Sequence, residues 1–249
     1  MIDMKLKVIG SGSSGNCYLL ETSGEVLIVE AGVKFLEIKK ALGFDLSRVI
    51  GCLVSHEHKD HSKCVDDLLR AGIPVYASKG TLEVLGAADS FNSRVLVSGK
   101  VVKVGEFDIL SFQTEHDAVE PLGFLFRHVE CGTVLFATDT YYLKQKFNGL
   151  NNILIECNYE NESLREKFET GVVVKPLYER LLSSHMSLRT CIKMLGMNDL
   201  GAVNNIILVH LSDSNSDAKL FRREVEVATG KKVFVADAGL SMEFNKTAF

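Results

Sequence analysis

The sequence predicts a layered α/β domain in which short strands and amphipathic helices alternate along the chain. Strand-length apolar runs occur in both halves, and stretches with helical spacing of apolar residues interrupt them. Several of the strand-like runs also end at a histidine or an aspartate. A chain of 249 residues is long enough to bury a large core, and we expect residues 1–249 to form a single domain.

The expected elements follow from these periodicities. Three stretches place apolar residues on one helical face, namely Val65–Leu69, Leu188–Leu195 and Ala218–Ala228. Ser187 is positioned to cap the second helix, and Gly230 to end the third. Strands are expected at Lys5–Ile9, Cys17–Glu21, Val26–Val29, Ile50–Val54, Phe107–Phe112, Gly123–Val129, Thr133–Ala137, Ile153–Ile155, Ile206–Val209 and Val233–Ala236.

Composition and charge exclude several classes of protein. The formal net charge is −4, which argues against a protein held to nucleic acid by overall positive charge, although a nuclease can bind phosphate through metal ions instead. No apolar run reaches the length of a membrane span, and Met1 to Lys7 lacks the apolar stretch of a secretory signal. We therefore expect a cytoplasmic protein with no membrane partner, whose 6 cysteines are reduced and buried.

The strongest functional signal is the segment HEHKDH at residues 56–61. Imidazole and carboxylate are natural ligands of zinc and similar divalent ions. His56 and His58 are two residues apart, so an extended backbone directs both side chains to one side. Asp60 and His61 follow where the chain turns into a helix, which places them against a second ion. The segment therefore predicts a dinuclear metal site.

The other candidate ligands follow strand-like runs, and we expect these strand ends to meet at one rim, where a rigid sheet directs side chains from adjoining loops. Two ions about 3.5–4 Å apart need a shared anion to offset their repulsion, and Asp139 is predicted to supply it. Taken alone, Asp139 would be a turn or cap aspartate, and a lone His116 or His210 would be structural; only the HEHKDH segment changes this interpretation. The runs that begin at Ile50, Phe107, Thr133 and Asn205 lead to His56, His116, Asp139 and His210.

These motifs resemble the metallo-β-lactamase fold superfamily. The pattern of HEHKDH, a separated histidine, an aspartate after an apolar strand and a late histidine is similar, as is Val26–Gly32, where Glu30 replaces the usual aspartate. The resemblance implies a four-layer αββα sandwich with two metal ions at one edge. It also implies two ligand sets, His56, His58, His116 and Asp139 for one ion and Asp60, His61, Asp139 and His210 for the other.

Finer motifs are similar to the YycJ/WalJ-like branch of that superfamily. Members of this branch are regarded as nucleases, including a DNA exonuclease that works from the 5′ end, so the resemblance implies a nucleic-acid partner, with DNA favoured as the substrate. One departure is Ser184–Leu188, which replaces a usual GHLSN around His185. The matching segments are the SGSSGN loop at 11–16, His116–Ala118 with Pro121–Phe124, Ile155–Asn158, Leu177–Arg180 and His185–Ser187.

The chemistry that fits these residues is hydrolysis of a phosphodiester by a hydroxide that bridges two metal ions. Asp60 is predicted to bind metal and orient the hydroxide, and His185 to hold the phosphate or protonate the leaving oxygen. A ligand set of histidines and carboxylates accepts Zn or Mn, and also Fe. The SGSSGN loop is either an anion-binding nest or a plain tight turn. Candidates for support behind the ligands or for substrate contact are Glu30, Ser13, Ser14 and Asn16.

Other interpretations remain open. The same ligands serve hydrolases of a small thioester, lactone or cyclic phosphate in this superfamily, and a non-catalytic metal-binding protein of the same fold is a further alternative. The sequence does not predict an oligomeric state. Four basic residues flank His185 and either follow a nucleic-acid backbone or form a solvated basic face, namely Lys175, Arg180, Arg189 and Lys193.

Overall fold

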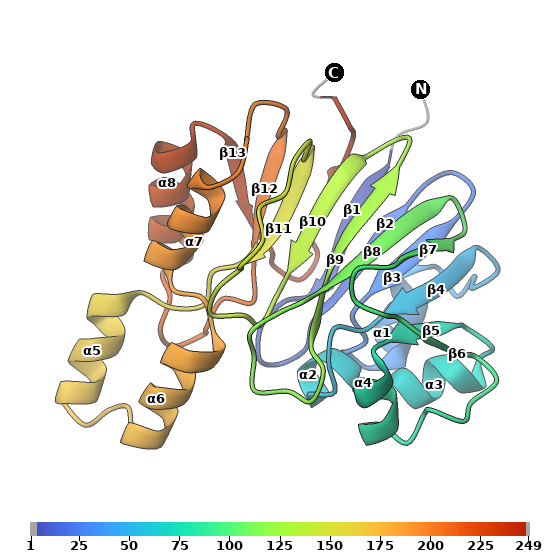
Figure 1. Cartoon of the computed structure of the whole chain (residues 1–249), viewed down its shortest axis with the longest axis horizontal. Helices are drawn as coiled ribbons and strands as arrows, with labels where there is room; N and C mark the ends of the chain where they lie inside the picture. Colours follow the sequence, from blue (N-terminus) through green and yellow to red (C-terminus); the bar gives the residue numbers. More distant parts are fainter. Residues whose placement is uncertain (1–3, 248–249) are drawn as a thin grey trace.

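Two seven-stranded β-sheets lie face to face in the computed structural model, which describes residues 4–247 (Figure 1). The first sheet consists, in spatial order, of β14 (Ser241–Glu243), β1 (Lys5–Gly10), β2 (Cys17–Glu21), β3 (Val26–Val29), β4 (Val49–Leu53), β5 (Val75–Ala77) and β6 (Ser93–Val95). The second consists of β13 (Lys232–Val235), β12 (Asn205–Val209), β11 (Asn152–Glu156), β10 (Gly132–Ala137), β9 (Leu122–His128), β8 (Phe107–Gln113) and β7 (Val101–Val104).

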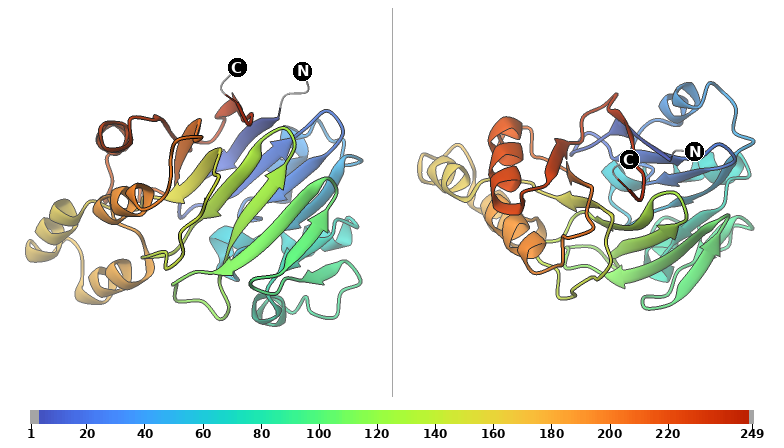
Figure 2. Two further views of the ribbon diagram at one scale, coloured as in Figure 1. Left: turned by 45° about the horizontal axis from the view of Figure 1, so that its top comes forward. Right: turned by 90° about the horizontal axis from the view of Figure 1, so that it is seen from above.

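Helices cover the outer faces of both sheets and complete the four-layer αββα sandwich that the sequence predicted (Figure 2). On the first sheet lie α1 (Phe35–Ala41), α3 (Val65–Arg70) and α4 (Lys79–Val84), and on the second lie α7 (Leu188–Gly196) and α8 (Ala218–Thr229). The short helix α2 (Lys59–Ser62) lies at the lower edge in Figure 1. A further pair, α5 (Asn161–Glu169) and α6 (Lys175–Ser184), projects to one side (Figure 1). Within residues 4–247, no helix has both the length and the apolar character needed to span a bilayer.

The apolar core has three main parts because each sheet is covered on two faces. Side chains such as Leu27, Phe124 and Phe136 meet between the two sheets. A second part joins the second sheet to α7 and α8, and a third joins the first sheet to α1, α3 and α4. Strands buried on both faces, such as β2, β3 and β11, are therefore continuous apolar runs rather than alternating ones.

Several strands end at the same edge of the sandwich. β10, β11, β12 and β13 are parallel, and β8 has the same direction because β9 is antiparallel to both of its neighbours. These strands run toward the lower edge in Figure 1. Glu30, Asp139 and His210 lie just beyond β3, β10 and β12 with φ of 69°, 45° and 54°. Such left-handed conformations cost a non-glycine residue about 1–3 kcal/mol each, which is typical of functional sites.

The backbone is unusually close-packed where the SGSSGN loop, the end of β3 and α2 meet at this edge. Asn16 N–H donates to the carbonyl of Asp60 at 2.7 Å, and Gly32 N–H donates to the carbonyl of Asn16 at 2.9 Å. A methyl group on Gly32 would lie 1.7 Å from the carbonyl oxygen of Asp60. Only glycine fits at this position, because the obstructing atoms belong to the backbone.

We expect Gly32→Ala to destabilise the fold by about 3 kcal/mol, because the new methyl group must push α2 away from the loop. Gly24→Ala is the matched control, since a methyl group there meets no atom within 4 Å, and its effect should stay within about 0.5 kcal/mol. Denaturant unfolding followed by circular dichroism measures both changes. Equal stability of the two variants would contradict the packing described here.

All six cysteines are free and buried, as the sequence predicted. Burial raises the pKa of the Cys64 and Cys131 thiols to about 12. A thiol-specific reagent at pH 8 should therefore label none of the cysteines rapidly in the native protein and all six in denaturant. A native thiol that reacts at once at pH 8 would contradict the burial of the cysteines.

The raised thiol pKa values also predict how stability depends on pH. The free energy of unfolding should fall as pH rises from about 9 toward 12, because only the unfolded state then releases its thiol protons readily.

Candidate metal centre

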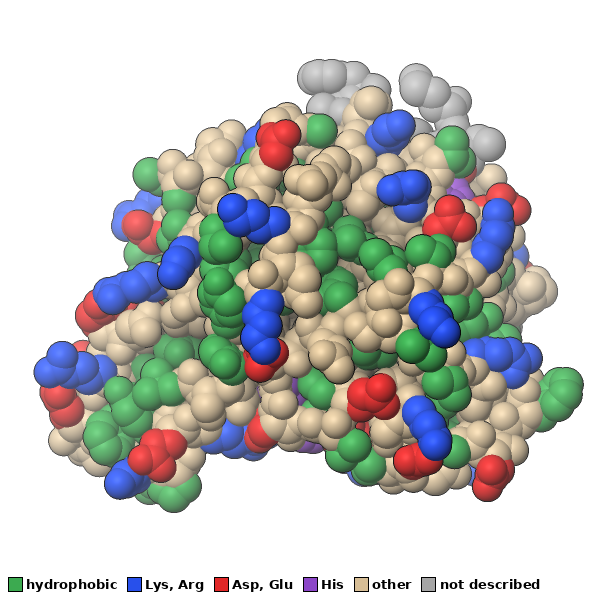
Figure 3. All heavy atoms as spheres, in the orientation of Figure 1, with side chains coloured by type: hydrophobic (Ala, Val, Ile, Leu, Met, Phe, Trp, Pro, Cys, Tyr) green, Lys and Arg blue, Asp and Glu red, His purple; other side chains and the backbone are tan. Residues whose placement is uncertain are grey.

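Six of the seven histidines gather around two aspartates at the edge where the strands end. The space-filling view shows histidine side chains in the recess of the lower edge, beside the lobe formed by α5 and α6 (Figure 3). The seventh, His128, lies on β9 against Phe107 and belongs to a different part of the molecule. The converging residues are His56, His58, His61, His116, His185, His210, Asp60 and Asp139.

The first group of candidate ligands contains His56, His58, His116 and Asp139. Nε2 of His116 lies 3.2 Å from Nδ1 of His58 and 3.4 Å from Oδ2 of Asp139. Nε2 of His56 lies 3.8 Å from the same aspartate oxygen. Four ligand atoms of the kinds that bind zinc or manganese therefore point to one position.

The second group contains Asp60, His61, Asp139 and His210. Nε2 of His210 lies 3.1 Å from Oδ2 of Asp60 and 3.4 Å from Oδ1 of Asp139. Nε2 of His61 lies 3.5 Å and 3.3 Å from the same two oxygens. Asp139 thus turns Oδ2 to the first group and Oδ1 to the second, which is the arrangement of a carboxylate that bridges two cations.

Nε2 of His56 is one of seven buried side-chain atoms within residues 4–247 that have no hydrogen-bond partner in the protein, and among these it is the one that faces the ligand group. The atom is fully enclosed. A buried polar atom without a partner costs about 1–3 kcal/mol, so it is rarely kept without a use. Its direction toward Oδ2 of Asp139 fits a metal ligand, and the donor set as a whole therefore fits a pair of divalent ions.

In four histidines of the cluster, the ring nitrogen Nδ1 faces away from the ligand groups and lies beside a neighbouring group that holds the ring in place. Nδ1 of His56 lies 2.9 Å from Oγ of Ser55, and Nδ1 of His116 lies 2.9 Å from the carbonyl oxygen of Ser184. Nδ1 of His61 lies 3.3 Å from Oε2 of Glu30. Asn158 lies 3.1 Å from Nδ1 of His210 and donates to its backbone carbonyl. For His56, His61 and His116 the neighbour is an oxygen that can accept the ring N–H, and contacts of this kind orient metal-binding histidines and select their tautomer. For His210 the neighbour is the amide nitrogen Nδ2 of Asn158, which holds the ring in position.

The charges at the site suit metal binding. Burial opposes ionisation of Asp139, but the neighbouring His210 and His61 hold the pKa of its carboxyl well below the usual range. Burial likewise opposes ionisation of Asp60, but its hydrogen bonds with His210 and His61 lower its pKa overall. Burial lowers the pKa of His56 well below its ordinary value. Burial also lowers the pKa of His61 and His210, but the nearby Asp139 raises it overall, so these two rings favour a proton when no cation is bound. Ionised carboxylates and neutral imidazole are the forms that coordinate a metal ion, so binding of an ion would release these protons.

Glu156 ends β11 beside the cluster and is fully buried. Together with Asp139, His185 and His210 it forms a third group with ligand-like spacing. Its oxygens are already occupied, however, because Oε2 accepts from the backbone N–H of Thr140 at 2.8 Å and of Met186, and Oε1 lies 2.6 Å from Nδ1 of His185. We therefore interpret Glu156 as the residue that holds His185 and not as a ligand.

A pocket of about 310 Å³ opens over the cluster. His58, Asp60, Asp139, His185 and His210 all contribute to its lining. The cluster is therefore accessible to a substrate, which is expected for an active site and not for a purely structural metal site.

The residues predicted from the SGSSGN loop have different positions. Asn16 is buried, and its Nδ2 donates to the carbonyl of Asp60 and lies 3.2 Å from Nε2 of His61. Ser13 lines the pocket, whereas Ser14 is exposed and lies outside its lining. Gly12 N–H donates to Oδ1 of Asn16, so the loop is closed by its own side chain and is a tight turn.

The four basic residues that flank His185 in the sequence do not form one continuous basic face. Lys175 pairs with Glu179, and Arg189 pairs with Glu162, both on the surface. Arg180 lines the pocket and pairs with Asp117 at 3.0 Å. Lys193 is exposed on α7 and does not line the pocket.

Sequence reasoning assigned no role to Ser55, Glu156, Asn158 or Ser184, all of which touch a histidine of the cluster. Glu156 alone carries a usable signal, because it is a charged residue that directly follows the apolar run Ile153–Ile155, much as Asp139 follows the apolar end of β10. The contact of Ser184 is made by its backbone carbonyl, so its residue type carries no information.

Known proteins resemble this chain in sequence and in fold. A family model described as a β-lactamase superfamily domain matches residues 27–211. Exodeoxyribonuclease WalJ of Streptococcus pneumoniae serotype 2 is 32% identical, across 98% of this chain and 93% of that protein. Exodeoxyribonuclease YycJ of Bacillus anthracis is 30% identical, across 93% of this chain and 91% of that protein.

Among solved structures, the metallo-β-lactamase fold protein YhfI of Bacillus subtilis matches with a TM-score of 0.76 and 18% identity, covering 97% of this chain and 99% of that one. This likeness concerns the fold, and it agrees with the αββα layers. The chain therefore belongs to the β-lactamase superfamily, in its metallo-β-lactamase fold branch that includes WalJ and YycJ.

Proposed function

We propose that this chain is a metal-dependent phosphodiesterase that degrades DNA from an end, with two divalent ions, Zn²⁺ or Mn²⁺ and alternatively Fe²⁺, as its cofactors. The observation that carries the proposal is the pair of ligand groups joined through Asp139 and open to a pocket. The names of the relatives WalJ and YycJ, both exodeoxyribonucleases, support DNA as the substrate class. DNA as substrate and reduced thiols both suit a cytoplasmic protein.

Some residues of the site are proposed to bind the metal ions, and others to act on the substrate. His56, His58 and His116 would hold one ion, His61 and His210 the other, and Asp139 both. Bound ions would supply a Lewis acid for the phosphate and lower the pKa of a water molecule. Because the net charge of the chain is −4, attraction of phosphate must arise locally at this site.

Asp60 is proposed to have two tasks. Its Oδ2 lies within 3.5 Å of the Nε2 atoms of both His61 and His210, and the residue also contributes to the pocket lining. A carboxylate in this position both binds a cation and accepts a hydrogen bond from a water molecule on the pocket side. Asp60 therefore orients the attacking water toward the phosphorus atom.

His185 is proposed to donate a proton to the leaving oxygen. The contact between Nδ1 and Glu156 leaves Nε2 of the ring as the nitrogen available to the pocket, whose lining includes His185. Burial alone would lower the pKa of His185, but the Glu156 carboxylate raises it to about 9, so the ring carries a proton to give at neutral pH. A general acid of this kind accelerates a reaction by about 10²–10⁴-fold.

The proposal is tested by offering purified protein, loaded with Zn²⁺ or Mn²⁺, single-stranded DNA, duplex DNA, RNA, a thioester and bis-p-nitrophenyl phosphate. We expect stepwise shortening of DNA and turnover of the small phosphodiester. Asp60→Ala should abolish both activities and lower the metal content from about two ions per chain, whereas Asp66→Ala, on the exposed face of α3, should leave them unchanged. Thioester cleavage without any phosphodiester cleavage would refute the proposal.

The role of His185 gives a separate prediction. His185→Gln should lower kcat on DNA by about 100-fold, because the alkoxide leaving group needs a proton. Turnover of bis-p-nitrophenyl phosphate should change by less than about twofold, since p-nitrophenolate leaves without protonation. The metal content, measured by elemental analysis, should stay the same. A parallel loss on both substrates would show that His185 supports the site in another way.

A further inference from the structure

The lining of the pocket has two chemically different parts besides the histidine cluster. One part comes from α6 and consists of Leu177, Arg180 and Leu181. The other is uncharged and polar, and includes Ser13, Ser212 and Asn215. A ligand that suits both parts needs an apolar surface as well as polar and anionic groups, which is the composition of a nucleotide.

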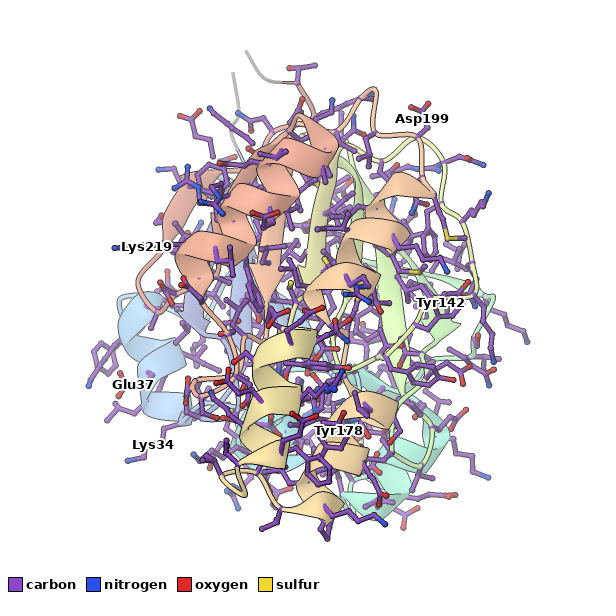
Figure 4. The ribbon with its side chains drawn as sticks, turned by 90° about the vertical axis from the view of Figure 1, so that its left-hand side faces the viewer. Lys34, Glu37, Tyr142, Tyr178, Asp199 and Lys219 are labelled. Carbon is purple, nitrogen blue, oxygen red and sulfur yellow. The ribbon has the colours of Figure 1, made fainter. Side chains whose placement is uncertain are left out.

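α6 packs on a small apolar core of its own, and its polar contacts with the sandwich include those of Ser184 with His116 and of Arg180 with Asp117. Tyr159, Leu164, Val173 and Leu181 form a separate apolar cluster, against which Tyr178 packs. Tyr178 also stacks on Phe168 of α5 with ring centroids 4.3 Å apart, and Figure 4 shows it beside the two helices. The pair of helices is therefore preformed, and it presents a fixed surface to the pocket.

Leu177 is exposed although it is a large apolar residue that lines a pocket. Its exposed fraction is 44%, and it is not part of the apolar cluster between α5 and α6. Leu182, on the same helix, is 40% exposed but does not line the pocket. Two leucines of similar exposure on one helix thus differ in whether they line the pocket.

Arg180 is the one member of the basic group around His185 that lines the pocket. Its Nε donates to Oδ2 of Asp117, the residue that follows His116. Both side chains are half exposed, and such surface ion pairs contribute about 0–1 kcal/mol. A phosphate can therefore replace Asp117 as the partner of Arg180 at little cost.

The size of the pocket limits what can enter. A volume of about 310 Å³ lies at the lower end of the range for ligand pockets and suits a ligand of the size of one nucleotide. A single unpaired nucleotide fits this size best, and an unpaired base is commonly held against an apolar side chain.

We propose that Leu177 and Arg180 select the substrate of this site: Leu177 packs against the unpaired base of the terminal nucleotide, and Arg180 binds the phosphate adjacent to the one that is hydrolysed. This inference rests on the proposed function and adds the class of substrate, a DNA end with an unpaired last nucleotide. Paired ends must open by one base pair before they react, so ends that carry a terminal mismatch react faster than fully paired ones.

The test of Leu177 combines a variant with a change in the substrate. Single-stranded oligonucleotides with a normal or an abasic nucleotide at the attacked end are compared in Leu177→Ala and in the matched control Leu182→Ala. For Leu177→Ala we expect KM to rise about tenfold with the normal end and less than about twofold with the abasic end. Leu182→Ala should match the wild type with both substrates.

The test of Arg180 uses salt. In Arg180→Gln the slope of log(kcat/KM) against log[salt] should decrease in magnitude by about the amount that corresponds to the loss of one phosphate contact. In Arg189→Gln, whose side chain lies outside the pocket, the slope should stay at the wild-type value. The control Arg189→Gln should also hydrolyse bis-p-nitrophenyl phosphate at the wild-type rate, since its side chain lies outside the pocket.

The outcomes separate the two proposals. If the wild type degrades DNA but Leu177→Ala affects normal and abasic ends equally, or Arg180→Gln keeps the wild-type slope, the inference about α6 is overturned and the proposed function stands. If the wild type hydrolyses bis-p-nitrophenyl phosphate but no DNA end, the proposed function fails and the inference fails with it.

Discussion

The arrangement at the edge of the sandwich depends on one buried, ionised carboxylate. Asp139 offers one oxygen to each of two histidine groups, and neither group would be complete without it. A buried carboxylate is costly unless cations or hydrogen-bond donors surround it. Here the surrounding histidines, and a hydrogen bond from Oγ of Thr138, supply that compensation, and the left-handed backbone at Asp139 directs both oxygens inward.

Two further buried carboxylates contact histidine rings of the cluster on the side that faces away from the pocket. Glu30 lies behind His61, and Glu156 lies behind His185, so each carboxylate faces a ring nitrogen that points away from the cluster. Both are fully buried and both receive backbone N–H groups, from Ser55 in the case of Glu30. The rings are thus held from behind by fixed charges, which limits their rotation and keeps the ligand atoms in place.

The sequence predicted those parts of the fold and site whose signal is local. Strands buried on both faces are largely apolar runs, and the HEHKDH segment contains four candidate ligands within six residues, so both could be recognised directly. The short edge strands β6 and β7 and the polar helix α5 were not predicted, because exposed elements lack a regular apolar pattern. Asn158 and Leu177 were equally hidden, since their roles depend on neighbours that only the folded chain supplies.

The helices α5 and α6 lie within the connection between β11 and β12 and have an apolar cluster of their own. None of the seven side chains in the two ligand groups belongs to them. The candidate metal ligands and the surface proposed to meet the polymer are consequently built from separate stretches of chain, although His185 directly follows α6 in the same connection. Evolution can therefore remodel much of that excursion, and with it the range of molecules accepted, while leaving the two ligand groups as they are, provided that His185 keeps its place.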